Sequence, residues 1–230
     1  LRDARSALLT LVCNSETTVT TVDDGTATLG SISRRAKLRF SGQPRNKHFL
    51  LPNLEHWARP IEYYTSFVGQ KGDPEDTFVQ QIHAPFRGLV AEGDNRLMIL
   101  GSPLVELGAL STGSYLSSMM KALEIPHDSV SYFPHRRETL WLDHWLKEHR
   151  VELVVAGTSV EEYLASKAHL PKRIAGFVST ALLYISERAP REVRIYRIRT
   201  SPLQWADPEY RRTSGLIEQY FTGVKRITTL

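Results

Sequence analysis

The chain has 230 residues, of which 41% are hydrophobic and 23% charged, and its formal net charge is +4 at pH 7. This composition is typical of a folded globular protein rather than a disordered or membrane protein. The single cysteine, Cys13, excludes an internal disulfide and a cysteine-based zinc site. The sequence shows neither an apolar run long enough to span a bilayer nor a signal peptide, so we expect a cytoplasmic protein with no membrane partner.

The N-terminal part shows two patterns in succession. Apolar residues at helical spacing predict a short helix over 2–13. Two strand-like stretches within 17–32, of which 17–22 is β-branched throughout, flank the turn Asp23–Thr26, and Asp-Gly at such a turn predicts a β-hairpin. We therefore expect an N-terminal helix and hairpin region over 1–75 and an α/β domain over 76–230. Whether the first region is a separate domain or extends the same sheet is left open.

From about residue 96, strand-like segments alternate with segments of helical periodicity. The stretch 151–156 is nearly continuously apolar, which is typical of a central strand covered on both faces. Such alternation predicts βαβ units and a mostly parallel, Rossmann-like sheet flanked by helices. The expected strands are 96–100, 104–107, 130–133, 151–156 and 192–199, and the expected helices are 114–123, 137–149, a long one within 160–187, and 208–226.

Two expected strand ends lead into helices through turns rich in small hydroxyl residues. These turns are Ser111-Thr112-Gly113-Ser114 and Gly157-Thr158-Ser159. The free amide groups and the positive dipole end of a helix N-terminus attract phosphate or carboxylate. Ordinary helix capping is the other interpretation, and Glu162, three residues after Ser159, would complete a capping box there.

A third expected strand end, after 130–133, carries cationic and titratable side chains. His135 and Arg136 follow that strand, and they are suited to neutralise an anion or polarise a carbonyl group. A solvated helix start is the alternative interpretation. Ligands in open α/β sheets bind beyond the carboxyl ends of the strands. We therefore expect an anion-binding domain whose partner is a phosphorylated small molecule or a nucleotide.

Catalytic motifs give no guidance on a reaction. The sequence has no P-loop, no Gly-x-Gly-x-x-Gly fingerprint, no Gly-x-Ser-x-Gly elbow and no His-Glu-x-x-His pair. We accordingly predict no cofactor and no metal. Whether the domain is a sensor or an enzyme is left open.

Basic residues suggest a second function class. A nucleic-acid-binding or assembly module would use one cluster near the N-terminus and one within 188–199, and salt-sensitive binding would distinguish it from a small-anion site. Solvated cations along an edge strand are the alternative interpretation. Whether the chain forms a homo-oligomer, and whether it is part of a larger parent protein, are left open. The residues concerned are Arg34, Arg35, Lys37, Arg39, Arg45 and Lys47 in the first cluster, and Arg194, Arg197 and Arg199 in the second.

Two family resemblances concern the same part of the chain. The spacing from Leu97–Pro103 through Val130–Phe133 to Val151–Ala156 resembles the first lobe of a type 2 periplasmic-binding-like effector domain, as in LysR-type regulators. The Ser111–Ser114 turn is similar to the phosphosugar loop of ribose-5-phosphate-isomerase-like and DeoR-type sensor domains. Both cover about residues 96–160 and rest on pattern without a diagnostic motif, so no family is assigned.

Overall fold

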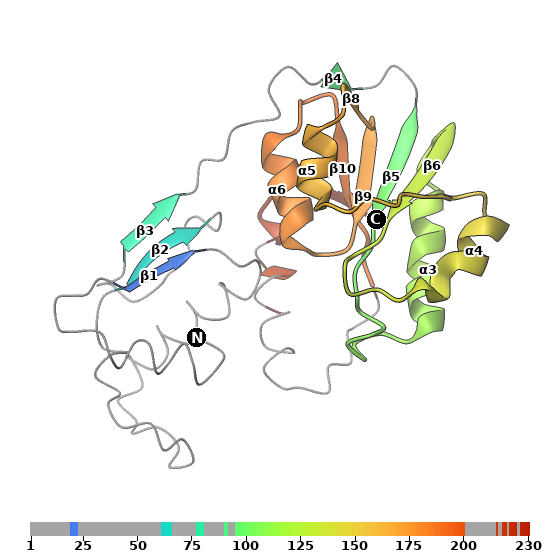
Figure 1. Cartoon of the computed structure of the whole chain (residues 1–230), viewed down its shortest axis with the longest axis horizontal. Coiled ribbons are helices and arrows are strands. Elements are labelled where there is room, and N and C mark those ends of the chain that lie inside the picture. Colours follow the sequence, from blue (N-terminus) through green and yellow to red (C-terminus); the bar gives the residue numbers. More distant parts are fainter. Residues whose placement is uncertain are drawn as a thin grey trace, which may run out of the picture. The chain divides into compact units, whose positions relative to one another are not determined.

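The computed structural model describes residues 95–200 continuously and the strand residues 19–22, 61–65, 77–80 and 90–91. Near the C-terminus it describes residues 215, 218–219, 221–224 and 226–230. The chain divides into two compact units, Leu1–Ile82 and His83–Leu230. The predicted α/β class is confirmed, because the second unit contains a six-stranded parallel sheet flanked by helices (Figure 1).

The described part of the first unit is a three-stranded parallel sheet. Its strands β1 (Val19–Val22), β2 (Ile61–Thr65) and β3 (Thr77–Gln80) lie in that order. The residues expected to complete the hairpin after β1, like the helix expected over 2–13, lie outside the described residues. Because prolines interrupt the pattern around β2 and β3, we did not predict these strands. The domain boundary after residue 75 stays a prediction.

In the second unit all six strands of the main sheet run parallel, in the order β11-β10-β9-β5-β6-β7. A separate parallel pair joins β4 (Val90–Ala91) to β8 (His169–Leu170). The second unit therefore contains the parallel sheet that the alternating sequence pattern predicted. The strands of the main sheet are β5 (Arg96–Leu100), β6 (Ser129–Phe133), β7 (Glu152–Leu153), β9 (Arg173–Gly176), β10 (Arg194–Arg197) and β11 (Ile227–Thr229).

Helices pack on both faces of this sheet (Figure 1). The 12-residue helix α3 (Thr112–Leu123) and the short pair η2 (Leu140–Leu142) and α4 (Asp143–Glu148) bury one face, where Leu97 and Ile99 of β5 lie in the main hydrophobic cluster. Helices α5 (Val160–Ala165) and α6 (Thr180–Arg188) lie on the other face. Alternate residues of β5 thus face opposite helical layers, and 97–100 are all buried.

Four expected elements differ from the structure. The apolar segment 151–156 is not central: only β7 forms there, at one edge of the sheet, and Val155 is 90% exposed. The long helix expected within 160–187 is instead α5, β8, β9 and α6, because the apolar run 174–177 is buried within the sheet rather than on a helix. The helix expected over 137–149 is reduced to η2 and α4, and 104–107 is a turn rather than a strand.

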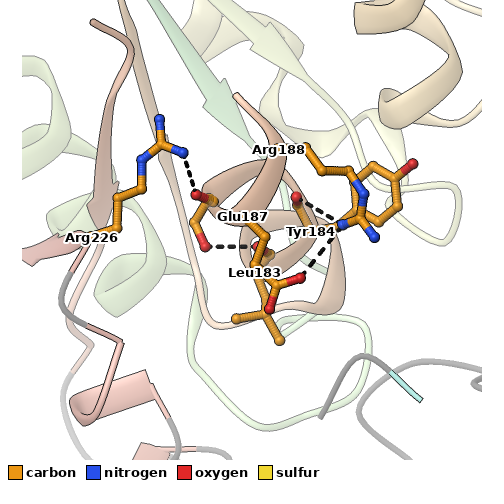
Figure 2. Close-up of polar contacts among 6 residues, drawn as sticks. Leu183, Tyr184, Glu187, Arg188 and Arg226 are labelled. Atoms are coloured by element: carbon orange, nitrogen blue, oxygen red, sulfur yellow. Dashed lines mark hydrogen bonds and ion pairs between the residues drawn. The ribbon is translucent and has the colours of Figure 1, made fainter. Parts of the chain in front are cut away.

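Two arginines satisfy carbonyl groups at the C-terminal end of α6 (Figure 2). Arg188 lies over the Tyr184 ring, 3.4 Å from its centroid, and donates to the Tyr184 carbonyl at 3.1 Å. Arg226, from the segment before β11, donates to the carbonyl oxygens of Ser186, at 2.7 Å, and Pro190. The carbonyls of the last four residues of a helix, here 185–188, lack partners within the helix, and Arg226 supplies a donor for that of Ser186. These contacts therefore fix the end of α6 and join the C-terminal segment to it.

Candidate functional site

All strands of the main sheet end on the same side, which we call the carboxyl end of the sheet. Helices α3, α5 and α6 each follow a strand, so each begins there. From β5 the chain adds β6 and β7 on one side, and afterwards β9, β10 and β11 on the other. The strand order therefore reverses between β5 and β9. In open α/β sheets, ligands bind outside the strand ends at such a switch point.

The turn after β6 holds His135 in one orientation. Its backbone carbonyl accepts from the Glu138 amide at 2.8 Å, and its ring Nδ1 accepts from the Arg137 amide at 3.1 Å. Because Nδ1 accepts, the ring proton of the neutral imidazole is on Nε2. His135 is half-buried, whereas Arg136 and Arg137 are exposed. The turn thus presents an N–H donor beside two cations at the carboxyl end of the sheet.

The Glu138 carboxylate is the junction of the residues around this turn. Its Oε2 accepts from the His135 amide at 2.6 Å. Its Oε1 accepts from the hydroxyls of Tyr132 at 2.6 Å and Tyr115 at 2.9 Å, and from the Ser102 amide at 3.1 Å. One carboxylate therefore joins the loops after β5 and β6 to the first turn of α3.

Gly101 makes room for this junction. A Cβ atom at this position would overlap Glu138 Oε2 and the Tyr132 hydroxyl, and it would lie 2.9 Å from Glu138 Cδ. The backbone at the end of β5 approaches the carboxylate more closely than any larger residue permits. Neither this approach nor the Glu138 network was anticipated from the sequence, because Glu138 accepts from residues as far as 36 positions away along the chain and only His135 is a near neighbour, at three positions.

Burial sets the protonation preferences of the network. It raises the pKa of the Glu138 carboxyl, and the hydrogen bonds from Tyr132, His135 and Tyr115 only partly offset this effect. Burial also raises the pKa of the Tyr115 and Tyr132 hydroxyls, so both remain donors. For His135, burial and then the neighbouring Arg136 and Arg137 lower the imidazole pKa, which favours the neutral ring.

The loop after β9 is on the other side of the switch point and leads into α6. The Ser179 side chain caps this helix by accepting from the Leu182 amide at 3.2 Å. The first turn carries no acidic residue, and within the described residues the amides of Thr180 and Ala181 have no hydrogen-bond partner. Residues 179–181 are half-exposed. This helix start therefore has the free donors and positive dipole end that suit an anion.

The predicted turn Ser111–Ser114 is at the start of α3. Ser111 caps the helix: its Oγ accepts from the Ser114 amide at 3.2 Å and donates to the Ser114 hydroxyl at 2.9 Å. Residues 111–113, including Thr112 and Gly113, are exposed, and the first turn contains no acidic residue. Capping and anion binding therefore remain compatible here.

The second predicted turn, at Thr158 and Ser159, has a different environment. Ser159 Oγ accepts from the Glu162 amide at 3.2 Å, and the Glu162 carboxylate accepts from the Ser159 amide at 3.1 Å, which completes the capping box. Glu161 adds a second carboxylate in the same turn. Two carboxylates at this helix start oppose a bound anion, so the capping interpretation describes this turn better.

The C-terminal basic cluster is not gathered on one surface. Arg197 is buried at the end of β10, where it forms an ion pair with Glu218 at 2.8 Å. Arg194 is exposed at the start of the same strand, and Arg199 is exposed beyond its end. The other predicted cluster, Arg34 to Lys47, lies outside the described residues.

Sequence reasoning missed Ser179, Thr180 and Glu138 as site residues. The helix predicted across 160–187 placed Ser179 and Thr180 in its interior, although a Ser-Thr pair before an apolar run is itself a helix-start signal. Within the described residues, no three His, Cys, Asp or Glu side chains lie close enough together to hold a metal ion. None of the described helices is long and apolar enough to cross a membrane.

Comparison with known proteins does not assign the chain to a family. The sequence matches no protein-family model, and no curated protein matches it significantly.

Proposed function

We propose that this chain binds a phosphorylated small molecule or a nucleotide at the carboxyl end of the second unit's sheet. The observation that carries the proposal is the reversal of strand order between β5 and β9. The two diverging loops there hold Gly101 and the start of α6. A ligand seated outside this point would meet helix-start amides on one side and the His135 turn on the other.

The residues supply complementary interactions for a phosphate group. The amides of Thr180 and Ala181 are donors at a positive helix end without nearby first-turn carboxylates. The His135 Nε2–H and the guanidinium of Arg136 add a neutral donor and a charge from the adjacent strand end. The exposed start of α3, at Ser111–Ser114, is a second anchor for a ligand with more than one anionic group. Binding of a phosphate group in this way is compatible with a sensor and with an enzyme.

The decisive variant is Thr180→Glu, which separates helix stability from anion binding. A carboxylate in the first turn of α6 interacts favourably with the macrodipole, so the melting temperature should be unchanged or higher. The same carboxylate repels a phosphate, and the dissociation constant should rise at least about tenfold. The matched comparison is Thr112→Glu, the same change at the first position of α3, which tests the second anchor separately.

Binding would be measured by thermal shift and calorimetry against inorganic phosphate, the ribonucleoside mono- and diphosphates and short oligonucleotides, at low and high salt. We expect one phosphorylated small ligand to stabilise the protein at both salt concentrations and to lose affinity in Thr180→Glu. Equal binding by that variant would refute the α6 site, and loss in Thr112→Glu alone would move the phosphate to α3. Stabilisation only by oligonucleotides, abolished by salt, would favour the nucleic-acid alternative instead.

A further inference from the structure

We propose that Glu138 is a positioning residue of the ligand site, which fixes the orientation of His135; this inference rests on the proposed function. Burying a carboxylate is costly unless its oxygens are hydrogen-bonded, and an apolar residue would fill the same space at lower cost. Here the carboxylate accepts from two backbone amides, those of Ser102 and His135, in the loops after β5 and β6. The Glu138 carboxylate therefore fixes the position of these two loops relative to each other at the carboxyl end of the sheet.

The distribution of donors explains why the residue is a glutamate. The Ser102 amide is on Oε1, at 3.1 Å, and the His135 amide is on Oε2, at 2.6 Å. A tyrosine hydroxyl can turn and accept, but a backbone N–H only donates. A glutamine has one accepting oxygen, so in either orientation its NH₂ group would face one of these amides. Glutamine is thus nearly isosteric with Glu138 but cannot accept from both loops: with its oxygen towards His135, the Ser102 amide keeps only the Tyr115 hydroxyl, at 3.1 Å, as an acceptor.

The hydrogen bonds continue from Glu138 to the imidazole. With its amide held by Oε2, His135 closes the turn through its carbonyl, which accepts from the Glu138 amide at 2.8 Å. This turn brings the Arg137 amide to Nδ1 and so selects the tautomer with its proton on Nε2. Weakening the hydrogen bond from the His135 amide to the Glu138 carboxylate should therefore weaken the preference of the ring for the Nε2–H tautomer. That effect is specific, because a residue that only stabilised the fold would change the melting temperature and leave the folded ring unchanged.

Glu106 offers a matched control on the same face. Its Oε1 accepts from the Thr139 amide at 2.8 Å, the Thr139 hydroxyl at 3.2 Å and the Trp141 indole N–H at 2.9 Å. Like Glu138, it bridges the loop after β5 to the segment after β6. The hydrogen bonds of Glu106 involve neither Ser102 nor His135, and all three donors meet Oε1, so Glu106→Gln can keep these bonds while it removes a carboxylate charge on the same face. Because the Glu106 charge raises the pKa of the His135 imidazole, the variants are compared at a pH at which the ring is neutral.

The test compares wild type, Glu138→Gln, Glu106→Gln, His135→Ala and the double variant Glu138→Gln/His135→Ala. Imidazole ¹⁵N shifts should move from a single Nε2–H tautomer towards a mixture in Glu138→Gln and stay at wild-type values in Glu106→Gln. The dissociation constants for inorganic phosphate and the four ribonucleoside monophosphates should rise about tenfold in Glu138→Gln and less than twofold in Glu106→Gln. In the His135→Ala background, Glu138→Gln should have no further effect.

Unchanged ring shifts in Glu138→Gln would overturn the inference, as would an effect on binding that adds fully to that of His135→Ala. If the wild type binds none of these probes, the proposed function fails, while the ring shifts still decide whether Glu138 orients His135. Glu138→Asp is the second variant if Glu138→Gln does not fold. It keeps both accepting oxygens but shortens their reach by one methylene group, and the same change in tautomer is expected.

Discussion

Gly101→Ala should destabilise the second unit through the Glu138 network. The new Cβ would overlap Glu138 Oε2 and the Tyr132 hydroxyl, and Glu138 Cδ would have to withdraw by at least about 0.5 Å to reach ordinary contact. That movement weakens hydrogen bonds to a partly buried carboxylate, at about 1.5–3 kcal/mol for a bond to a charged group, in addition to the overpacking itself. We expect a loss of about 3 kcal/mol in the free energy of unfolding.

The assay is urea and thermal unfolding followed by circular dichroism, with an expected fall in melting temperature of roughly 6–12 °C for a unit of this size. Gly113→Ala is the matched control, because a Cβ there meets nothing within 4 Å. Since Gly113 is inside α3, alanine should be neutral or stabilising by up to about 1 kcal/mol. A Gly101→Ala variant within experimental error of wild type would refute the close approach of Glu138 to the backbone of β5.

Three further predictions concern separate contacts. Ser159→Ala removes the capping box of α5 and should cost about 1 kcal/mol, seen as a melting temperature lower by roughly 2–4 °C, with ligand affinity unchanged. Arg226→Gln removes the donors to Ser186 and Pro190 and should cost about 1–3 kcal/mol. Hydrogen exchange should be faster at the C-terminal end of α6, and unchanged protection there would contradict the anchoring role. Burial and the neighbouring Arg136 and Arg137 keep the pKa of His135 below 6.5, so the stability due to its neutral form is present above pH 6.5 and is lost as the pH falls through the lower folded pKa. A proton NMR titration of the imidazole should therefore show a midpoint below 6.5, and one at or above it would contradict this account.

Local patterns in the sequence were enough to predict several elements. The alternation of strand-like and helical segments from residue 96 predicted the parallel sheet, and β5, β6, β10 and α3 all form within or close to their expected ranges. The capping box at Ser159 was likewise readable from its Ser-x-x-Glu spacing. These features are determined over a few residues, by side-chain periodicity and by hydrogen bonds between near neighbours.

Only the tertiary structure decided which strands are central and which residues meet. The segment 151–156 is as apolar as a central strand, yet β7 pairs with β6 alone, whereas β9, expected to be helical, is buried between β5 and β10. An apolar run of this length suits either a buried helix or a buried strand, and the partners that cover it settle the choice. The same holds at the site: whether Glu138 is a solvated surface charge or the acceptor of four hydrogen bonds depends on Ser102, Tyr115 and Tyr132, which chain folding brings to it from other elements.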